Sequence, residues 1–539
     1  MKKITGLLSI IFAFIFTIVL ASCSSTSGVE VEKNVTATTS SITFELTFAR
    51  NENLENKTAS PYIKAFNYDE TKEDNIGTYV SKQDCTFSGV YTSSTVTFTS
   101  LTKGAKYVFR FYVTYNQSDE LIATWVESTL SDNKKEIKTV DDFLAMKDDR
   151  DGEYTLMNDI DFSGEKLTGL FNSSSQSFTG VFNGNGYTIS NFLFESSDNG
   201  IFGYTKDALI KNVKIVGTDE EYLLNNLDEE GNPLELVNGN FGSRSDANIG
   251  TLVGNAENTE FVDVTIDNVN LSLKGNNKAT LKVGGVVGLA LNCSFTNVKA
   301  TNISITSEKL CTNVYVGLFA GAINGDALET DNGTYTAKNT SASGEIKATL
   351  SYGSYEGNAY IGGYAGDLGS SGLVSESYTD ADITLYRDPK TSNSNKFSLV
   401  VGGFAAGNLG GSMWVDGCVA AADIKVVAGS DSTTLEDAAL SKLCTKTSYF
   451  GGFVGVINKH INRIENSCYV KKSAGLNVYA LESETDEESN VKTLIVKNNV
   501  YANKQYDAIL TNLVCANDDA FDTSVLASEV SAVVAKYLA

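Results

Sequence analysis

Ile249-Gly250-Thr251-Leu252-Val253-Gly254 is the stretch that decides the fold, because it returns with changes along most of the chain. Related glycine cassettes occur at Val283–Gly288, Val316–Gly321, Ile361–Gly366, Val401–Gly407 and Phe450–Gly455, and a shorter one at Gly200–Gly203. Self-similarity at intervals of tens of residues is typical of a solenoid, in which each repeat packs on its neighbours.

A second pattern follows each cassette and has the form apolar, small polar, apolar. Its members are Ile210, Asn212 and Val213; Phe261, Asp263 and Val269; Phe295, Asn297 and Ile303; Val374, Ser377 and Ile383; and Val415, Cys418 and Ile424. The surrounding runs are short, alternating and rich in β-branched residues, which predicts strands. We therefore expect an all-β fold, a right-handed parallel β-helix, with handedness set by the general rule for parallel crossovers. Glycines should supply positive-φ corners, and the small polar residues should form an inward ladder.

The repeats are uneven, with intervals from 33 residues (Gly284 to Gly317) to 48 residues (Gly403 to Gly451). A constant coil with loops of different length inserted on one side explains this variation. A propeller or a string of sandwiches is the competing interpretation, but no partner tryptophan-aspartate signature accompanies the cassettes.

Length and composition point to two or more domains in an acidic protein. The 539 residues include 42 basic and 66 acidic side chains, for a formal charge of −24. Such a chain should be repelled by nucleic acid and by anionic lipid surfaces, so we expect no nucleic-acid partner.

Residues 1–22 have the features of a bacterial lipoprotein signal peptide. Lys2 and Lys3 precede an apolar run from Leu7 to Leu20, and Leu20-Ala21-Ser22-Cys23 resembles the lipobox. The resemblance implies cleavage before Cys23 and acylation of that residue, palmitate included, which would anchor the protein to a membrane. Residues 23–29 would form a polar tether. The alternative is an ordinary secretory signal followed by a chance cysteine.

Residues 30–130 alternate apolar and polar side chains, which predicts a separate β-sandwich. The passage from Leu101 to Tyr112 resembles a strand-turn-strand of fibronectin type III domains, in which Tyr107 would form a tyrosine corner near Leu101. We expect a spacer here, and a ligand-binding module is the alternative.

Residues 135–515 are expected to form the β-helix, with a short helix at its start. Thr139 is a suitable N-cap, and acidic residues follow in the first turn. The passage from Val140 to Gly203, with Asn158-Asp159-Ile160-Asp161 and Phe178-Thr-Gly-Val-Phe-Asn183-Gly-Asn-Gly186, resembles the opening of bacterial surface β-helices with GLUG-type repeats. The resemblance implies an adhesin-like protein.

Residues 517–539 have helical periodicity, and their apolar positions are Leu526, Val530, Val533, Val534, Tyr537 and Leu538. A helix at the end of a solenoid should cover the last exposed coil. A partner-binding helix is the alternative.

The sequence carries little that predicts catalysis. His460 is the single histidine and lies in an expected loop, so a Ser-His-Asp or Cys-His arrangement is not indicated. Arginine is sparse in the repeats (Arg244, Arg387 and Arg463), and none lies in an obvious acid-rich strand. We therefore expect no enzyme. The alternative is a polysaccharide lyase or glycoside hydrolase, which would need acids and one Lys or Arg together on one β-helix face.

Asn158, Asp159 and Asp161 are candidate calcium ligands, because they offer side-chain oxygens on a short strand. They lack the spacing of a dedicated loop, so turn formation and capping is the alternative. We expect no other cofactor.

The cysteines do not suggest a disulfide framework. Cys23 would carry lipid, and the other seven, Cys85, Cys293, Cys311, Cys418, Cys444, Cys468 and Cys515, are odd in number and irregular in spacing. We expect mostly reduced, buried thiols.

Together these features predict an extracytoplasmic, lipid-anchored surface protein that binds carbohydrate or cell-surface protein. A structural stalk is a further alternative. The expected contact loops are Thr218–Ala247, Ser351–Asn358, Asp388–Lys396 and Gly429–Leu440.

Overall fold

The computed structural model contains two units: the first comprises Met1–Asn34 and Thr38–Thr129, and the second comprises Val35–Ala37 and Leu130–Ala539. The structure describes residues 29–50, 60–69, 71–72, 74–85, 91–115, 118–129, 135–163, 166–167, 169–194, 200–218, 239–241, 247–274, 280–309, 313–325, 335–350, 357–369, 372–387, 397–408, 413–428, 448–457, 463–472, 494–497, 509–516 and 521–538. The signal peptide, Cys23 and the tether through Gly28 lie outside these residues, as do His460, Arg244 and most of the four expected contact loops.

The first unit is a sandwich of two sheets. One sheet has the order β1 (Val29–Ala37), β2 (Ile42–Arg50), β5 (Tyr91–Phe98), and the other has the order β4 (Ile76–Asp84), β3 (Ser60–Tyr68), β6 (Lys106–Tyr115), β7 (Ser118–Ser128). Phe44 of β2 lies 4.8 Å from Phe109 of β6 and 5.3 Å from Trp125 of β7 between ring centroids. These contacts join the two sheets through an aromatic core.

Tyr107 makes the hydrogen bond that the sequence predicts for it. The backbone N–H of Thr102 donates to Tyr107 Oη at 2.6 Å, and the ring is 2 % exposed. The side chain therefore ties the start of β6 to the turn that precedes it.

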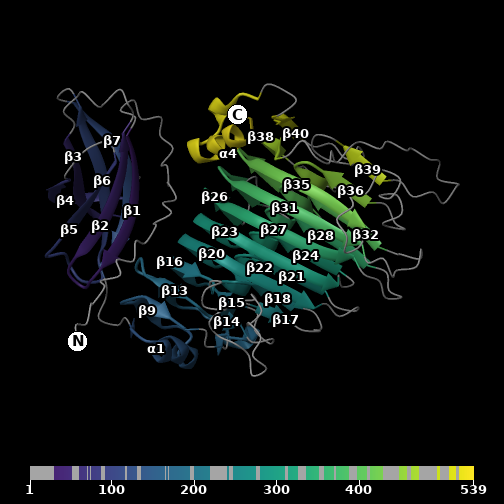
Figure 1. Ribbon diagram of the computed structural model, residues 1–539. Coiled ribbons are helices and arrows are strands. Elements are labelled where there is room, and N and C mark those ends of the chain that lie inside the picture. The colour runs from purple at the N-terminus through teal and green to yellow at the C-terminus, as the bar shows by residue number, and fades with distance from the viewer. Residues whose placement is uncertain are drawn as a thin grey trace, which may run out of the picture. The chain divides into compact units, whose positions relative to one another are not determined.

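The second unit is the expected right-handed parallel β-helix, formed by three sheets (Figure 1). The main sheet contains β8 (Lys135–Ile137), β9 (Glu153–Leu156), β10 (Ile160–Asp161), β11 (Lys166–Leu167), β12 (Val181–Asn183), β13 (Thr188–Ser190), β14 (Leu193–Phe194), β16 (Leu209–Val216), β17 (Gly239–Phe241), β20 (Glu260–Lys274), β23 (Ser294–Lys309), β26 (Tyr335–Lys338), β27 (Ser341–Leu350), β30 (Gly372–Ser375), β31 (Tyr378–Arg387), β34 (Met413–Asp416), β35 (Val419–Ala428), β38 (Arg463–Lys471) and β40 (Ile509–Cys515).

Two side sheets complete each coil. Side sheet 1 contains β18 (Ala247–Gly250), β21 (Thr280–Gly284), β24 (Asn313–Gly317), β28 (Gly357–Gly362), β32 (Phe397–Gly402), β36 (Ser448–Gly451) and β39 (Leu494–Lys497). Side sheet 2 contains β15 (Phe202–Lys206), β19 (Val253–Glu257), β22 (Val287–Leu291), β25 (Ala320–Asn324), β29 (Ala365–Leu368), β33 (Ala405–Asn408) and β37 (Val454–Ile457). Each of the six full glycine cassettes joins a strand of side sheet 1 to a strand of side sheet 2.

The residues between the cassette glycines stack on their counterparts one coil away, as expected. Phe319, Tyr364, Phe404 and Phe453 form one column with centroid distances of 4.6, 4.7 and 5.0 Å and interplanar angles of 10° or less. Their burial inside the solenoid is complete. Stacked aromatic columns of this kind fix the register of successive coils.

The cassette glycines serve a different purpose from the one expected. In the full cassettes they do not provide positive φ, because Gly250, Gly284 and Gly317 are absent from the described residues with positive φ, whereas Gly200 of the shorter cassette has φ of 148°. A Cβ on Gly284 would instead lie 2.2 Å from the Val287 carbonyl oxygen and 2.6 Å from Ala320 Cα. The glycines are needed because the backbones of the two side sheets touch; we call this contact the glycine seam.

Asparagine and aspartate make the positive-φ corners of the main sheet. Asp263, Asn297 and Asn339 have φ of 53°, 55° and 52° on successive coils. Asn297 Nδ2 donates to Asp263 Oδ1 at 2.8 Å, and Asn339 Nδ2 donates to Asn297 Oδ1 at 2.9 Å. These short side chains tolerate the left-handed conformation and bond along the ladder.

The inward ladder is a separate column, one residue after each corner. Thr340 Oγ1 and Ser377 Oγ are 2.8 Å apart, and Cys418 N–H donates to Ser467 Oγ at 3.0 Å, all in buried positions. The small polar residues of the sequence pattern were expected to form one ladder, but they belong to two columns. Ser377 and Cys418 belong to the inward column, and the asparagines belong to the column of corners.

The N-terminal cap is as expected. Thr139 is the N-cap of α1 (Val140–Leu144). Its Oγ1 accepts from the Asp142 N–H, and the Asp142 carboxylate accepts from the Thr139 N–H. A 3-10 turn, Ala145–Asp148, follows. Phe143 is fully buried and packs edge to face on Phe162 and Phe182, which closes the first coil.

The C-terminal helix α4 (Ser528–Leu538) does not lie where expected. A 3-10 turn (Thr523–Val525) precedes it, and it packs against β31, β35 and β38 on the outer face of the main sheet instead of over the last coil. Val530 and Val534 bury against Val419 and Cys468, which point outward from their strands. The helix covers this position because the outer face is apolar there.

Candidate functional site

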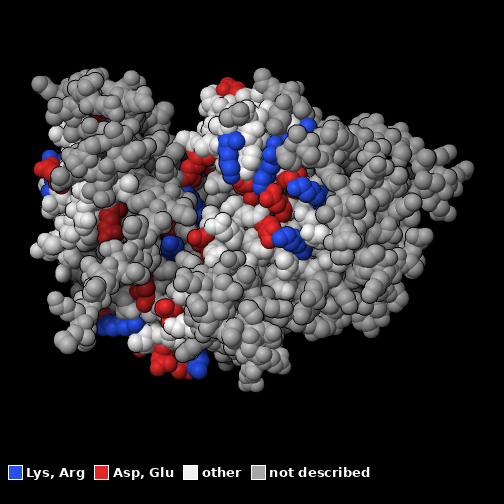
Figure 2. Space-filling model, in the orientation of Figure 1, with Lys and Arg blue, Asp and Glu red and all other residues white. Residues whose placement is uncertain are grey.

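A strip of charged side chains lies beside α4 on the outer face of the main sheet. It consists of Glu345, Lys347, Asp380, Asp382, Asp423, Lys425 and Lys472, and we call it the charged strip. Figure 2 shows acidic and basic side chains alternating over this part of the surface. Parallel strands bring four carboxylates and three amines together on this face.

Strand register builds the strip in rows. Glu345 of β27, Asp382 of β31 and Asp423 of β35 are direct neighbours. Two residues further along the same strands, Lys347 and Lys425 stand on either side of Thr384. Neighbouring strands are about 4.8 Å apart and side chains two residues apart share a face, so an acidic row lies next to a basic row.

Each row is held by ion pairs within a strand. Lys347 Nζ lies 2.7 Å from Glu345, and Lys425 Nζ lies 2.7 Å from Asp423, whose side chain is only 8 % exposed. The pairing offsets the repulsion that the acidic row would otherwise suffer. The rows are therefore fixed in position.

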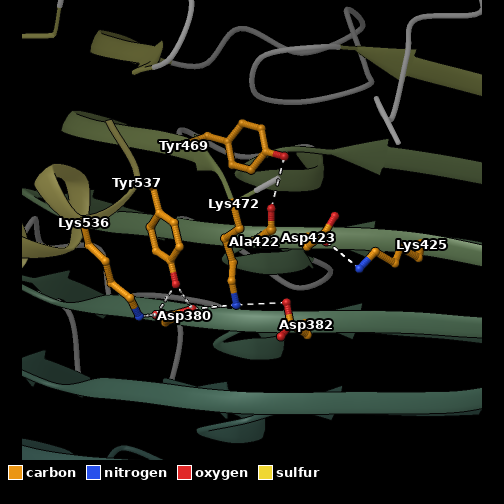
Figure 3. Close-up of polar contacts among 9 residues, drawn as sticks. All are labelled: Asp380, Asp382, Ala422, Asp423, Lys425, Tyr469, Lys472, Lys536 and Tyr537. Carbon is orange, nitrogen blue, oxygen red and sulfur yellow. Dashed lines mark hydrogen bonds and ion pairs between the residues drawn. The ribbon is translucent and has the colours of Figure 1, made fainter. Parts of the chain in front are cut away.

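Asp380 is the most heavily bonded member of the strip (Figure 3). Its carboxylate lies 2.6 Å from Lys472 Nζ and 2.8 Å from Lys536 Nζ, and Tyr537 Oη donates to it at 2.7 Å. Lys472 also lies 2.9 Å from Asp382. Since Lys536 and Tyr537 belong to α4, Asp380 fastens the helix to the sheet.

The electrostatics keep these groups charged. Burial opposes ionisation of Asp380, but hydrogen bonds from Lys472, Lys536 and Tyr537 outweigh it and hold the pKa of Asp380 below its usual value. Burial alone would lower the pKa of Lys472, yet the hydrogen bonds to Asp380 and Asp382 raise it. A carboxylate with a lowered pKa is a fixed anion and a poor proton donor, so Asp380 is suited to holding a partner in place.

The strip contains part of what the enzyme alternative requires. Four acids and three lysines share one β-helix face, and the side chain of Asp382 is 55 % exposed. Arg463 lies elsewhere on the sheet, where its guanidinium is 4.5 Å from the Trp414 ring and 3.1 Å from Glu465.

Sequence reasoning missed the strip, although a weak signal was present. Asp380-Ala-Asp382, Glu345-Ile-Lys347 and Asp423-Ile-Lys425 all place charges two residues apart in strands. Their alignment depends on the register between coils, which the unequal loop lengths conceal.

The three candidate calcium residues are each engaged with the protein. Asn158 Nδ2 donates to the Lys138 carbonyl at 2.9 Å, Asp159 accepts from the Thr188 N–H at 2.8 Å, and Asp161 accepts from the Ser163 N–H at 2.7 Å. These are the turn and capping contacts of the alternative interpretation. Calcium binding here stays a prediction. Among the described residues, no group of three or more His, Cys, Asp and Glu side chains is arranged to hold a metal ion.

The expected reduced cysteines are confirmed where the structure describes them. Cys85, Cys293, Cys418 and Cys468 are free thiols, and these four residues and Cys515 are buried. Burial raises the pKa of Cys293 and of Cys468 to about 12. In the strand register, Cys468 is the neighbour of Val419 and not of Cys418. The two cysteines therefore lie one residue apart in the repeat and do not occupy equivalent positions of their coils. Cys311 and Cys444 lie outside the described residues.

Comparisons with known proteins give distant similarities. No protein-family model matches the chain. Halomucin of Haloquadratum walsbyi is 25 % identical over 271 residues, which cover 48 % of this chain and 2 % of halomucin. An IgA1 protease is similar with a TM-score of 0.35 and 12 % identity, over 74 % of this chain and 28 % of the protease.

A family 28 exopolygalacturonase of Yersinia enterocolitica is similar with a TM-score of 0.26 and 10 % identity, over 90 % of this chain and 99 % of that one. This chain thus spans a small part of halomucin and of the protease. Among the described residues, no helix is long and apolar enough to cross a membrane.

Proposed function

We propose that this chain is an extracytoplasmic binding protein, anchored by a lipid on Cys23, that uses its β-helix to hold carbohydrate or cell-surface protein. The observation that carries the proposal is the charged strip, in which strand register places acids and lysines in fixed rows on a rigid sheet. Complementary arrays of fixed charge favour specific recognition. The resemblance to GLUG-type adhesins supports the same role.

In this proposal the sandwich is a fibronectin type III-like module between the anchor and the β-helix. The strand orders β1-β2-β5 and β4-β3-β6-β7 and the Tyr107 hydrogen bond support that assignment. An acylated Cys23 would place both units on the outer side of a membrane.

A glycan array and a panel of surface proteins, probed with the chain from Val29 to Ala539, test the proposal. The variant Glu345→Gln/Asp382→Asn/Asp423→Asn should lose at least tenfold in affinity for whatever the parent binds, because it removes the acidic row. Glu260→Gln is the matched control, since Glu260 is exposed on the same sheet and lies outside the strip. Binding that is equal in the triple variant and the parent would show that the strip is not the binding face.

The second candidate is a polysaccharide lyase or glycoside hydrolase. The specific observation in its favour is the set of four carboxylates with Lys472 on one face, since such enzymes act through carboxylates or a base beside the scissile bond. Release of sugar fragments by the parent, abolished in Asp382→Asn and retained in Glu260→Gln, would establish the enzyme. Binding without release would support the adhesin. The same array, run with calcium and with a chelator, tests Asn158, Asp159 and Asp161.

A further inference from the structure

The outer face of the sandwich sheet β4-β3-β6-β7 carries three cations in one row. Lys64 on β3 is directly opposite Lys82 on β4 and Arg110 on β6. Like charges in direct cross-strand positions are destabilising. A row of this kind in a chain of formal charge −24 is therefore a feature that the fold alone does not require.

Tyrosine rings hold two of these cations in place. Tyr62 and Tyr112 stack with centroids 5.3 Å apart. Lys64 Nζ lies 5.3 and 5.0 Å from the two ring centroids, and Lys82 Nζ lies 4.2 Å from that of Tyr62. Cation–π contacts of this kind orient an ammonium group without neutralising it.

Three acids lie beside the row. The pKa of Asp119 is lowered by hydrogen bonds from Tyr62 and Thr114 and by the nearby charges of Lys64 and Lys82. Asp84 pairs with Lys82 at 2.7 Å but is 79 % exposed, and Asp74 pairs with Arg110 at 3.4 Å and is 56 % exposed. Exposed pairs of this type contribute little and exchange readily.

Apolar side chains flank the cationic row. Tyr79, Leu121 and Val126 are 58 %, 40 % and 48 % exposed, and they are three of the five large hydrophobic residues exposed in the described chain. Tyr79 is opposite Phe66 on β3, Val126 is opposite Val108, and Leu121 is opposite Tyr112. Such a concentration of exposed apolar surface around fixed charge marks an interaction site.

We propose that this face binds an anionic polysaccharide built of carboxylated sugars. The cations recur once per strand, about 4.8 Å apart, which is close to the length of one pyranose ring in an extended chain. Each sugar carboxylate would pair with Lys82, Lys64 or Arg110, while the C–H faces of the rings would rest on Tyr79 and its apolar neighbours. This adds a second binding face to the proposed function and makes the sandwich more than a spacer.

Single-stranded nucleic acid fits this face less well. Successive bases would each need a free aromatic face, yet Tyr62 and Tyr112 are stacked on each other. The acidic remainder of the chain also repels a ligand of high charge density more than a polymer of spaced carboxylates.

Calorimetric binding of oligogalacturonate to the chain from Val29 to Ala539 tests the proposal. Fully methyl-esterified oligogalacturonate is the neutral control ligand, and single-stranded DNA is the competing polyanion. We expect the acidic oligomer to bind at low salt and the ester to bind at least tenfold more weakly. The variant Lys64→Gln/Arg110→Gln should lose at least tenfold, whereas Lys147→Gln/Lys214→Gln, two exposed lysines of the other unit, should bind as the parent does.

The outcomes separate this proposal from the proposed function of the β-helix. Removing like charges should leave the thermal midpoint of Lys64→Gln/Arg110→Gln unchanged or higher, and Tyr79→Ala provides a second, surface-only variant that should weaken binding severalfold. No binding of oligogalacturonate, equal binding of the ester, or tighter binding of DNA would each overturn the carboxylated-sugar proposal. Array ligands that depend on Glu345, Asp382 and Asp423 would be unaffected by these variants, so each face can fail alone.

Discussion

The glycine seam and the α4 contact are two close packings of the same β-helix, and they are stabilised by opposite means. In the seam, backbones touch, and a Cβ on Gly317 would lie 2.5 Å from Ala365 Cα. In the α4 contact, a helix rests on the main sheet through Asp380, Lys472 and Lys536, with apolar residues beneath. The seam depends on shape, whereas the α4 contact depends strongly on charge.

This difference separates the part of the molecule that must be rigid from the part that can respond. A shape-limited contact is insensitive to pH and salt but does not accept one added carbon atom. A charge-limited contact accepts changes of size but weakens when a partner is neutralised. We therefore expect the seam to define the fold and the α4 contact to be the adjustable element.

The largest effect should come from Gly284→Ala. The new Cβ would lie within 2.6 Å of backbone atoms of Val287 and Ala320, which cannot move without displacing a coil. We expect a loss of about 4 kcal/mol or more, at the upper limit for one substitution, and insoluble protein on expression. Differential scanning calorimetry of any soluble fraction measures the change.

Gly417→Ala is the control that sharpens the first prediction. Gly417 has φ of 62°, but the nearest atom to its added Cβ is 3.9 Å away. Only backbone strain should then act, at about 1–2 kcal/mol. Similar losses at the two positions would contradict the view that the seam is limited by space.

Much of the fold was predictable from the sequence because stacking repeats itself. The apolar residues of the cassettes at Val283 and Val316, the Thr139 cap and the Tyr107 corner each carry a local signal, and each has its expected structural role. The steric reason for the cassette glycines was not predictable, since the sequence of a single repeat does not show how closely the backbone of a neighbouring coil approaches. The lateral position of α4 was missed because the outward apolar residues, Val419 and Cys468, look like core residues in sequence.

The second effect concerns Asp380→Asn. The substitution removes the charge that binds Lys472, Lys536 and Tyr537, and Asp380 is 14 % exposed. We expect the docking of α4 to weaken by about 2–3 kcal/mol while the solenoid stays folded. Hydrogen exchange of the amides in Ser528–Leu538 measures the local loss.

Asp382→Asn is the matched control for Asp380→Asn. Its side chain is 55 % exposed and it contacts Lys472 but does not bond α4 in the described structure. The expected loss is under about 1 kcal/mol. Equal exchange rates in the two variants would mean that apolar packing and the buried ion pair of Glu529 with Lys299, and not Asp380, hold the helix.

Acidification should release α4 before it affects the seam. The folded pKa of Asp380 is lowered, so its contribution to docking is present above the unfolded value of about 3.9 and is lost as pH falls through the folded pKa. Exchange of α4 amides, corrected for the intrinsic pH dependence, should be steady from pH 7 to 5 and rise below about pH 4. In Asp380→Asn the rise should be flattened, and an unchanged profile would assign the effect to another acid.

The smallest effect is a change in thiol reactivity that reports on the same contact. Cys468 lies beneath α4 against Val530 and Val534, and burial raises its pKa to about 12. Cys293 lies in the main core and has a similarly raised pKa of about 12. In the parent, both cysteines should resist alkylation at pH 8, because each thiol is protonated and inaccessible to the reagent. In Asp380→Asn, mass spectrometry should show faster alkylation of Cys468 and none of Cys293, because the helix opens while the coils do not.

Alkylation of both cysteines at one rate would mean that α4 and the solenoid unfold together, and the separation between a rigid seam and a responsive helix would be wrong.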